Sequence, residues 1–181
     1  MAVSINADAT VEWQSTWYGM RHPGEYDYDQ VLARTTFPFL IAENWGSEAI
    51  LESSQWLAPF SRDRLDDKIG FQAYCDVFIT SDDVYRIVIV ANNGIILHVD
   101  DEVLIHSWDN VLPDGGGTRS VSAEIKLDAG RHRFELWYYE WEGIALLYFD
   151  SNISPLASDR MVDQLNEARM ESEDAGDATL D

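Results

Sequence analysis

The residues best suited to bind a ligand lie in three short polar or aromatic segments. Asn92-Asn93 and Gly94 separate two apolar runs, Asp100-Asp101 follow the second run, and Trp141 stands beside a Glu-Gly turn. Asn and Gly tolerate positive φ, so Asn92-Asn93-Gly94 fits a hairpin turn. The same amides could instead contact a polar ligand, because loops at the ends of a β-fold commonly carry binding. From the sequence, both interpretations stay open.

The acidic and aromatic members of this set have different expected roles. An acid at a turn accepts backbone N–H bonds, and we expect Asp100 to organise its turn in this way. Asp101 beside it is a further candidate for ligand contact. The chain has seven tryptophans. Most tryptophans of a β-sandwich belong to the core, but a sugar ring stacks on an exposed aromatic face, and we expect Trp141 to be such a contact.

The sequence contains few features that indicate catalysis. No zinc-ligand spacing, phosphate-binding loop or nucleophile elbow is present, and no acid pair for glycoside hydrolysis stands out. Cys75 is the single cysteine, so no internal disulfide can form. Its place in an apolar alternation predicts a small buried side chain. We therefore expect a binding or structural domain rather than an enzyme.

The charge balance is the most unusual feature of the composition. The chain has 33 acids and 12 bases, a net charge of −21, and its lysines are Lys68 and Lys126. Self-repulsion of this size destabilises a compact fold in dilute buffer, whereas at about 1 M salt the screening length falls to roughly 3 Å. Many acids with few lysines favour a halophilic protein; an ordinary acidic protein is the alternative. No basic patch for nucleic acid is present.

The elements that must position these residues follow from an almost continuous β pattern. From about 15 to 153, short runs rich in β-branched and aromatic residues are separated by turn residues. This pattern predicts an all-β fold, an antiparallel β-sandwich or barrel-like structure. Two alternating runs predict core-facing strand positions at Ile69, Phe71, Ala73 and Cys75, and at Tyr85, Ile87, Ile89 and Ala91. The runs on either side of Asp100-Asp101 predict a hairpin over 95–106.

The two ends of the chain have a different character. Residues 1–14 form a weakly patterned N-terminal lead with no basic start or long apolar stretch, so no signal peptide is visible in this chain. Helical spacing after Pro155 predicts a short C-terminal helix, followed by an acidic tail, within 154–181. No run of about 18 apolar residues exists, so we expect no membrane span.

Several blocks of the sequence match one known pattern, in the right order. Ala91–Asp101 is similar to a Ser-Asp-Asp-Gly segment followed by Leu-x-Val/Ile-Asp-Gly, and Ile105 and Trp108 occupy the positions of the Ile and Trp that come next. Leu127–His132 is similar to a Leu-Glu-Ala-Gly-Lys-His turn, and Leu136–Glu140 to an Ile-Glu-Tyr-Tyr-Glu strand. These blocks resemble the protective-antigen type domain, which is also found in yeast flocculins and inserted in some β-glucosidases. The resemblance implies a β-sandwich that binds or assembles.

The resemblance also implies a calcium-dependent sugar site. In the adhesin members, the two adjacent acids of the Asp-Asp-Gly motif bind Ca²⁺, which then holds sugar hydroxyls. Ca²⁺ takes six to eight oxygen ligands. Here Asn92 and Asn93 replace both acids, and their amide oxygens carry no charge. Asp100, Asp101 and Asp109 are nearby in the sequence and could compensate, so the candidate metal ligands are Asn92, Asn93 and Asp109.

Two functions remain open at this point. The first is a virion surface subunit, such as a decoration, turret or spike protein of a virus that infects a halophile. Such a subunit would form a homo-oligomer or bind other virion proteins. The alternative is a stand-alone carbohydrate-binding or adhesion protein of a halophilic cell. Both predict a place on the extracellular surface or the virion, and a cell-surface glycan or glycoprotein as partner.

Overall fold

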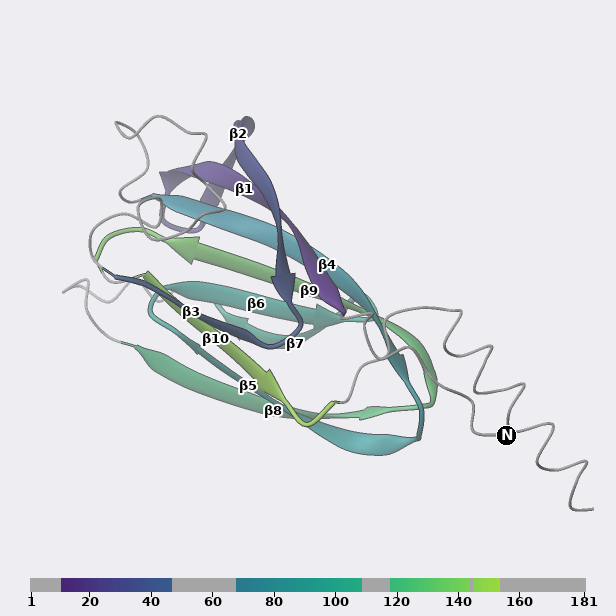
Figure 1. Cartoon of the computed structure of the whole chain (residues 1–181). Helices are drawn as coiled ribbons and strands as arrows, with labels where there is room; N and C mark the ends of the chain where they lie inside the picture. Colours follow the sequence, from purple (N-terminus) through teal and green to yellow (C-terminus); the bar gives the residue numbers. More distant parts are fainter. Residues whose placement is uncertain (1–10, 47–67, 109–117, 144, 154–181) are drawn as a thin grey trace, which may run out of the picture.

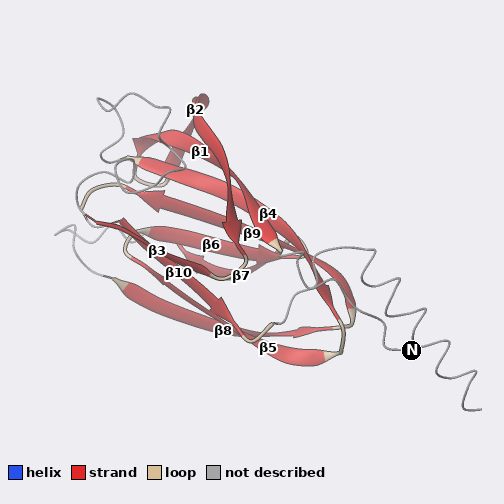
Figure 2. Cartoon of the chain, viewed as in Figure 1, coloured by secondary structure: helices blue, strands red, loops and turns tan. Residues whose placement is uncertain are grey.

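The computed structural model describes residues 11–46, 68–108, 118–143 and 145–153, which contain ten strands (Figures 1 and 2). The strands are β1 (Glu12–His22), β2 (Glu25–Pro38), β3 (Ile41–Gly46), β4 (Ile69–Ile79), β5 (Asp83–Ala91), β6 (Gly94–Val99), β7 (Glu102–Ser107), β8 (Arg119–Leu127), β9 (Gly130–Glu140) and β10 (Ala145–Ser151). The predicted C-terminal helix and acidic tail lie outside the described residues. Within the described ranges, no helix is long and apolar enough to cross a membrane.

The strands form two antiparallel sheets that lie one over the other (Figure 1). The six-stranded sheet has the order β2-β1-β4-β9-β6-β7, and the four-stranded sheet has the order β3-β10-β5-β8. The predicted all-β antiparallel sandwich is therefore confirmed. Strand β1 begins at Glu12, inside the segment predicted as the lead.

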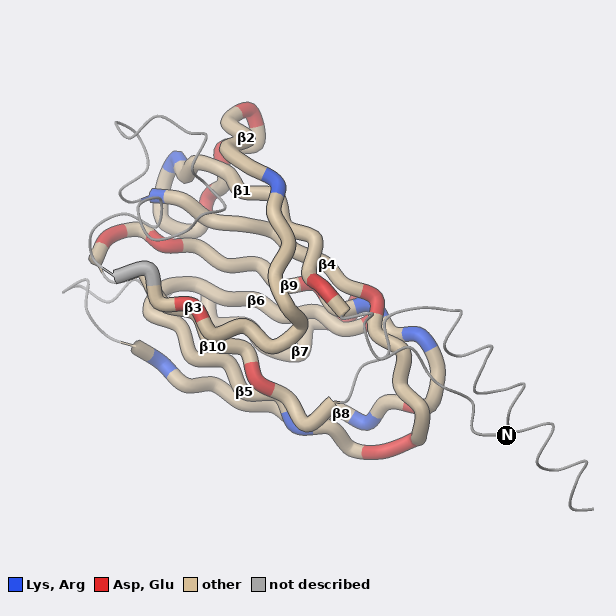
Figure 3. Tube along the Cα trace, in the orientation of Figure 1, with Lys and Arg blue, Asp and Glu red and all other residues tan. Residues whose placement is uncertain are grey.

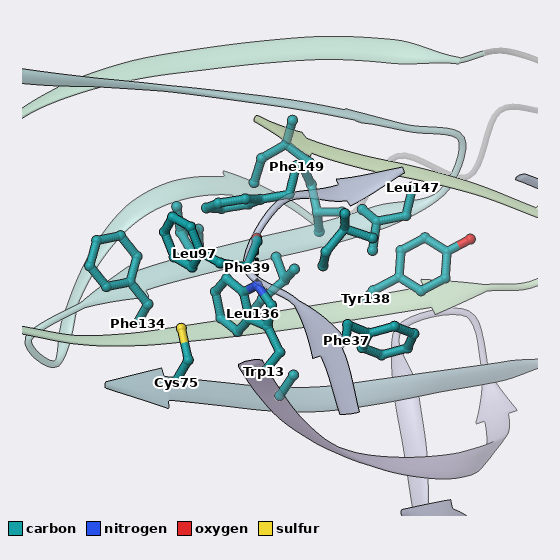
Figure 4. Packing of buried hydrophobic residues seen from close by; sticks show 14 of the residues in the cluster. Trp13, Phe37, Phe39, Cys75, Leu97, Phe134, Leu136, Tyr138, Leu147 and Phe149 are labelled. Carbon is teal, nitrogen blue, oxygen red and sulfur yellow. Dashed lines mark hydrogen bonds between the residues drawn. The ribbon is translucent and has the colours of Figure 1, made fainter. Parts of the chain in front are cut away.

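The core fills the space between the two sheets because alternate residues of each strand point inward. On β4, the predicted inward positions from Ile69 to Cys75 are each at most 3% exposed, and on β5 Ile87 and Ile89 are fully buried. Figure 4 shows β6 and β9 side chains packed toward Phe149 of β10. Charged positions lie mainly at strand ends and loops (Figure 3). Cys75 is buried as predicted, and burial raises the pKa of its thiol.

At one end of the sandwich, two short connections carry the chain from one sheet to the other, and both hold candidate residues. The chain passes from β5 to β6 at Asn92-Asn93, and from β9 to β10 at Trp141–Gly143. We call the end of the sandwich that holds both connections the Trp141 end. The opposite end holds the turn from β6 to β7 at Asp100-Asp101, and we call it the Asp100 end.

The predicted hairpin turn with positive φ at Asn92-Asn93-Gly94 is wrong. These residues join strands of different sheets, and the described non-glycine residues with positive φ are Lys68 (66°), Asp100 (51°) and Asp101 (67°). Positive φ at both central residues is the geometry of a two-residue type I′ hairpin, which matches the right-handed twist of the strands it joins. Asp100-Asp101 therefore form the tight turn, and the hairpin predicted over 95–106 is confirmed.

Candidate functional site

A buried polar layer closes the core at the Trp141 end. Asn92, Asn93 and Glu140 are 4%, 7% and 1% exposed. Asn93 Nδ2 donates to Glu140 Oε2 at 2.6 Å, while Asn92 Oδ1 accepts from Tyr138 Oη at 3.4 Å and from the Leu146 amide at 3.3 Å. Burial, and then the nearby Glu140 carboxyl, raises the pKa of Tyr138 well above its usual range, so the phenol keeps its proton. The two asparagines therefore link the sheets instead of facing solvent.

Aromatic rings cover the outer side of the six-stranded sheet next to this layer. Gly94 leaves room for the Tyr139 ring, which a Cβ at position 94 would overlap. Tyr139 Oη donates to the Trp108 carbonyl at 2.9 Å, and their ring centroids are 4.8 Å apart. Trp108 Nε1 donates in turn to the Gly24 carbonyl at 3.0 Å. Together with Tyr26 these rings form a second, smaller apolar cluster outside the main core.

Trp141 forms the rim of the Trp141 end. Its side chain is half-buried and packs against the small aromatic cluster. The ammonium of Lys68 lies 5.0 Å from the centroid of the Trp141 ring. A cation–π contact at an exposed site is worth about 0.5–1 kcal/mol, so a ligand can displace the lysine at small cost. The rim thus offers an aromatic face and a hydrogen-bond donor next to each other.

The Asp100 end is built differently. Asp100 Oδ1 accepts the Arg133 amide at 2.8 Å, and Asp100 Oδ2 lies 2.6 Å from His132 Nδ1. His132 Nε2 lies 2.7 Å from the Asp128 carbonyl oxygen. Burial alone would lower the pKa of His132, but these hydrogen bonds outweigh it and raise the pKa. Asp100 therefore holds its turn against β9, and Asp101 beside it is exposed.

The structure separates the predicted site residues into two groups. Asn92, Asn93 and Trp141 lie together at one end, whereas Asp100 and Asp101 follow the far end of β6. Six strand residues at about 3.3 Å each place the two groups roughly 20 Å apart. Asp100 and Asp101 therefore cannot complete one site with the asparagines.

The described residues do not fit the predicted calcium site. Asn92 and Asn93 are buried, and Asn92 Oδ1 and Asn93 Nδ2 are bonded to protein groups, so neither side chain faces open space where Ca²⁺ could gather six to eight oxygens. In the part of the chain that the structure describes, no group of three or more His, Cys, Asp or Glu side chains is placed to hold a metal ion. Asp109 lies outside the described residues, and its part in a calcium site stays a prediction.

Two residues at the Trp141 end were not anticipated. Glu140 continues the alternation of β9, and nothing in its sequence context distinguishes a buried carboxyl from an exposed one. Lys68 is far from Trp141 in the sequence, and its contact with the ring depends on the start of β4 meeting the end of β9, where Ile69 pairs with Glu140. The pairing of β4 with β9 brings both residues to the Trp141 end.

No family model and no curated relative matches the sequence. Among solved structures, an anti-sigma factor domain-containing protein is similar with a TM-score of 0.59 and 18% identity; the match covers 78% of this chain and 43% of that one, so this chain spans less than half of its length. The PA14 domain of the MpAFP antifreeze protein has a TM-score of 0.55 at 11% identity, over 85% of this chain and 88% of that one. The adhesin 9 A domain from Candida glabrata, solved with Galβ1-4GlcNAc, has a TM-score of 0.56 at 10% identity, over 82% and 84%. At these identities the likeness is one of fold.

Proposed function

We propose that this chain, which has the fold of a protective-antigen type (PA14) domain, is a non-enzymatic sugar-binding module whose site lies at the Trp141 end. The observation that carries the proposal is the pairing of a half-buried Trp141 ring with the Lys68 ammonium on the rim of that end. The likeness to an adhesin domain solved with a disaccharide supports the ligand class.

The chemistry of this rim suits a saccharide. One face of a pyranose ring carries C–H groups that pack on an aromatic plane, and its edge carries hydroxyls that need donors and acceptors. Trp141 supplies the plane, and the three N–H groups of Lys68 supply donors after the ammonium leaves the ring. Beneath them, the bonded layer of Asn93 and Glu140 keeps the end of β9 in place. A site held by a rigid layer loses little entropy when it binds.

The test is a glycan array probed with the wild-type protein and two matched variants at about 1 M NaCl, where charge repulsion is screened. Trp141→Ala is expected to weaken binding of the best glycan by about tenfold or more, which corresponds to roughly 1.4 kcal/mol. Tyr148→Ala removes a 37% exposed ring from β10 in the four-stranded sheet and is expected to bind like the wild type. Wild-type binding by Trp141→Ala would place the sugar site elsewhere and refute the proposal.

The setting proposed for this module is a salt-rich one, on a halophilic cell or its virus. The net charge of −21 with two lysines supports this setting. The oligomeric state of the purified protein, measured from its native mass in molar salt, tests the virion-surface role. A closed symmetric oligomer supports that role, whereas a monomer that binds glycans favours the stand-alone adhesion protein.

A further inference from the structure

A polar groove crosses the outer face of the six-stranded sheet, away from the Trp141 end. Its volume is about 610 Å³, within the range of roughly 300–1,000 Å³ that is usual for ligand sites. It lies over the middle of the strands, since Tyr74 is the central residue of β4. The lining comes from three neighbouring strands: Gln14, Ser15 and Thr16 of β1, Arg34, Thr35 and Thr36 of β2, and Tyr74 of β4.

Strand register brings these side chains together. Gln14 of β1 pairs with Thr36 of β2 on one side and with Tyr74 of β4 on the other. Thr16, two residues on, pairs with Arg34 of β2. Successive strand residues point to opposite faces, and the tryptophans that flank Gln14 and Thr16 along β1 are buried in the core. Gln14 and Thr16 therefore project outward, between a wall from β2 and a wall from β4.

The floor of the groove is stiffened from the core side. Ser15 is 3% exposed, and its hydroxyl donates to the Thr35 carbonyl at 2.8 Å and contacts Thr35 Oγ1 at 2.7 Å. Trp17 Nε1 donates to the same Thr35 Oγ1 at 3.0 Å. These bonds fix β2 against β1, although β2 is an edge strand of the sheet. The walls are thus in place before a ligand arrives, which lowers the entropic cost of binding.

The lining is uncharged apart from one guanidinium. It contains hydroxyls, an amide, Arg34 and the Tyr74 ring, and no carboxylate. Among the ion pairs within the described part of the chain, none involves Arg34, and its guanidinium brings five N–H donors to the groove. Tyr74 is 46% exposed, with the Arg133 guanidinium 4.6 Å from its ring centroid. An exposed ring beside amide and hydroxyl groups suits a ligand with many hydroxyls.

We propose that this groove is a second saccharide site, which binds a neutral glycan chain laid along the face of β4, β1 and β2. A site on a sheet face contacts a chain along its length, whereas the Trp141 end meets a sugar at a loop rim. Two acids flank the groove: Glu12 is two residues before Gln14 on β1, and Glu135 of β9 pairs with Tyr74. These two carboxylates offset the charges of Arg34 in the lining and of Arg133 beside Tyr74, so the groove has no excess positive charge to attract a polyanionic chain. Stacking and hydrogen bonding to a neutral chain persist in molar salt.

The experiment is a titration of ¹⁵N-labelled protein with neutral hexasaccharides, β-1,4-linked glucose and β-1,4-linked mannose, at about 1 M NaCl. The expected result is that one of them shifts the amide signals of Gln14, Thr16 and Tyr74. Tyr74→Ala is expected to weaken this binding by about tenfold, and Arg34→Gln by about threefold. Tyr148→Ala is the matched control for loss of an exposed ring and is expected to bind like the wild type.

The outcomes separate the groove from the site at the Trp141 end. If neither hexasaccharide shifts the groove amides, or if Tyr74→Ala binds as the wild type does, the groove is not a saccharide site. Loss of binding in Trp141→Ala alone would overturn the groove and leave the proposed function standing. Tighter binding of a hexasaccharide of uronic acids than of either neutral chain would also contradict the inference.

Discussion

Replacing Asn93 by aspartate tests the buried polar layer of the Trp141 end most sharply. The wild-type amide donates to Glu140 Oε2 at 2.6 Å, and both side chains are more than nine-tenths buried. Asn93→Asp keeps the shape of the side chain but removes the N–H donor and brings a second carboxyl to the first. It also restores one acid of the motif that the asparagines replace.

The expected loss of stability is large because the change leaves two acids in one desolvated place. Leaving a buried charge uncompensated costs about 3–5 kcal/mol, and small domains unfold with about 5–15 kcal/mol in total. We therefore expect Asn93→Asp to lose about 3–5 kcal/mol when both carboxyls would be ionised. A shared proton between the two carboxyls would relieve most of this loss, as in other carboxyl pairs at close range.

The loss of stability in Asn93→Asp should grow as pH rises. One carboxyl of the pair has a raised pKa in the folded variant, so the folded state binds more protons than the unfolded state above the ordinary carboxyl pKa of about 4. Stability then falls as pH rises from that value to the raised one. Asn93→Asp should be close to the wild type near pH 4 and furthest below it near pH 8.

Urea unfolding at about 1 M NaCl, at acidic and mildly alkaline pH, measures the effect. The matched control is Asn152→Asp, which adds the same charge at an exposed site where the new carboxylate can still accept the Arg86 amide. We expect the control to lie within about 0.5 kcal/mol of the wild type at both pH values. Equal effects of the two substitutions would refute the buried pair. Rescue of Asn93→Asp by Ca²⁺ would show that this layer can become a metal site.

Four further predictions follow from the packing and the charges. Gly94→Ala should lose about 1–3 kcal/mol in urea unfolding, because the new methyl overlaps the Tyr139 ring; wild-type stability would contradict that packing. Asp100→Asn keeps the acceptor for the backbone but loses the charge beside His132, whose pKa is raised in the folded protein. Its cost of about 0.2–1 kcal/mol should be present below pH 6.5 and vanish as pH rises through the folded pKa; a cost that is the same at pH 5 and 9 would refute the pairing. Cys75 should react with a thiol reagent at the rate of unfolding, since it is buried and the pKa of its thiol is raised; fast labelling of the folded protein would contradict this. The unfolding temperature should rise with NaCl up to about 1 M, and full stability in dilute buffer would count against the salt-rich setting.

The strand pattern could be predicted because burial follows the period of two along each strand. The positions from Ile69 to Cys75 alternate in polarity and face the core as expected. The hairpin over 95–106 could be predicted as well, because its turn residues follow directly on an apolar run. Each of these features depends on residues that are close in the sequence.

The placement of the candidate residues could not be predicted, because it depends on which strands pair. Asn92-Asn93 has the composition of a hairpin turn, but the strand that follows lies in the other sheet, so the amides are drawn inside. Asp100 is close to Asn93 in sequence and about 20 Å away in space, since a strand separates them. Arg34 and Tyr74 line one groove although β1 stands between their strands.

Mapping a bound glycan on the protein tests whether this domain binds a sugar at the Trp141 end. The best ligand from the array is titrated into ¹⁵N-labelled protein at about 1 M NaCl, and the amide signals that shift are placed on the structure. We expect the largest shifts at Lys68 and Trp141, with smaller ones at Asn93. Shifts confined to the turn at Asp100-Asp101 or to the four-stranded sheet would contradict it.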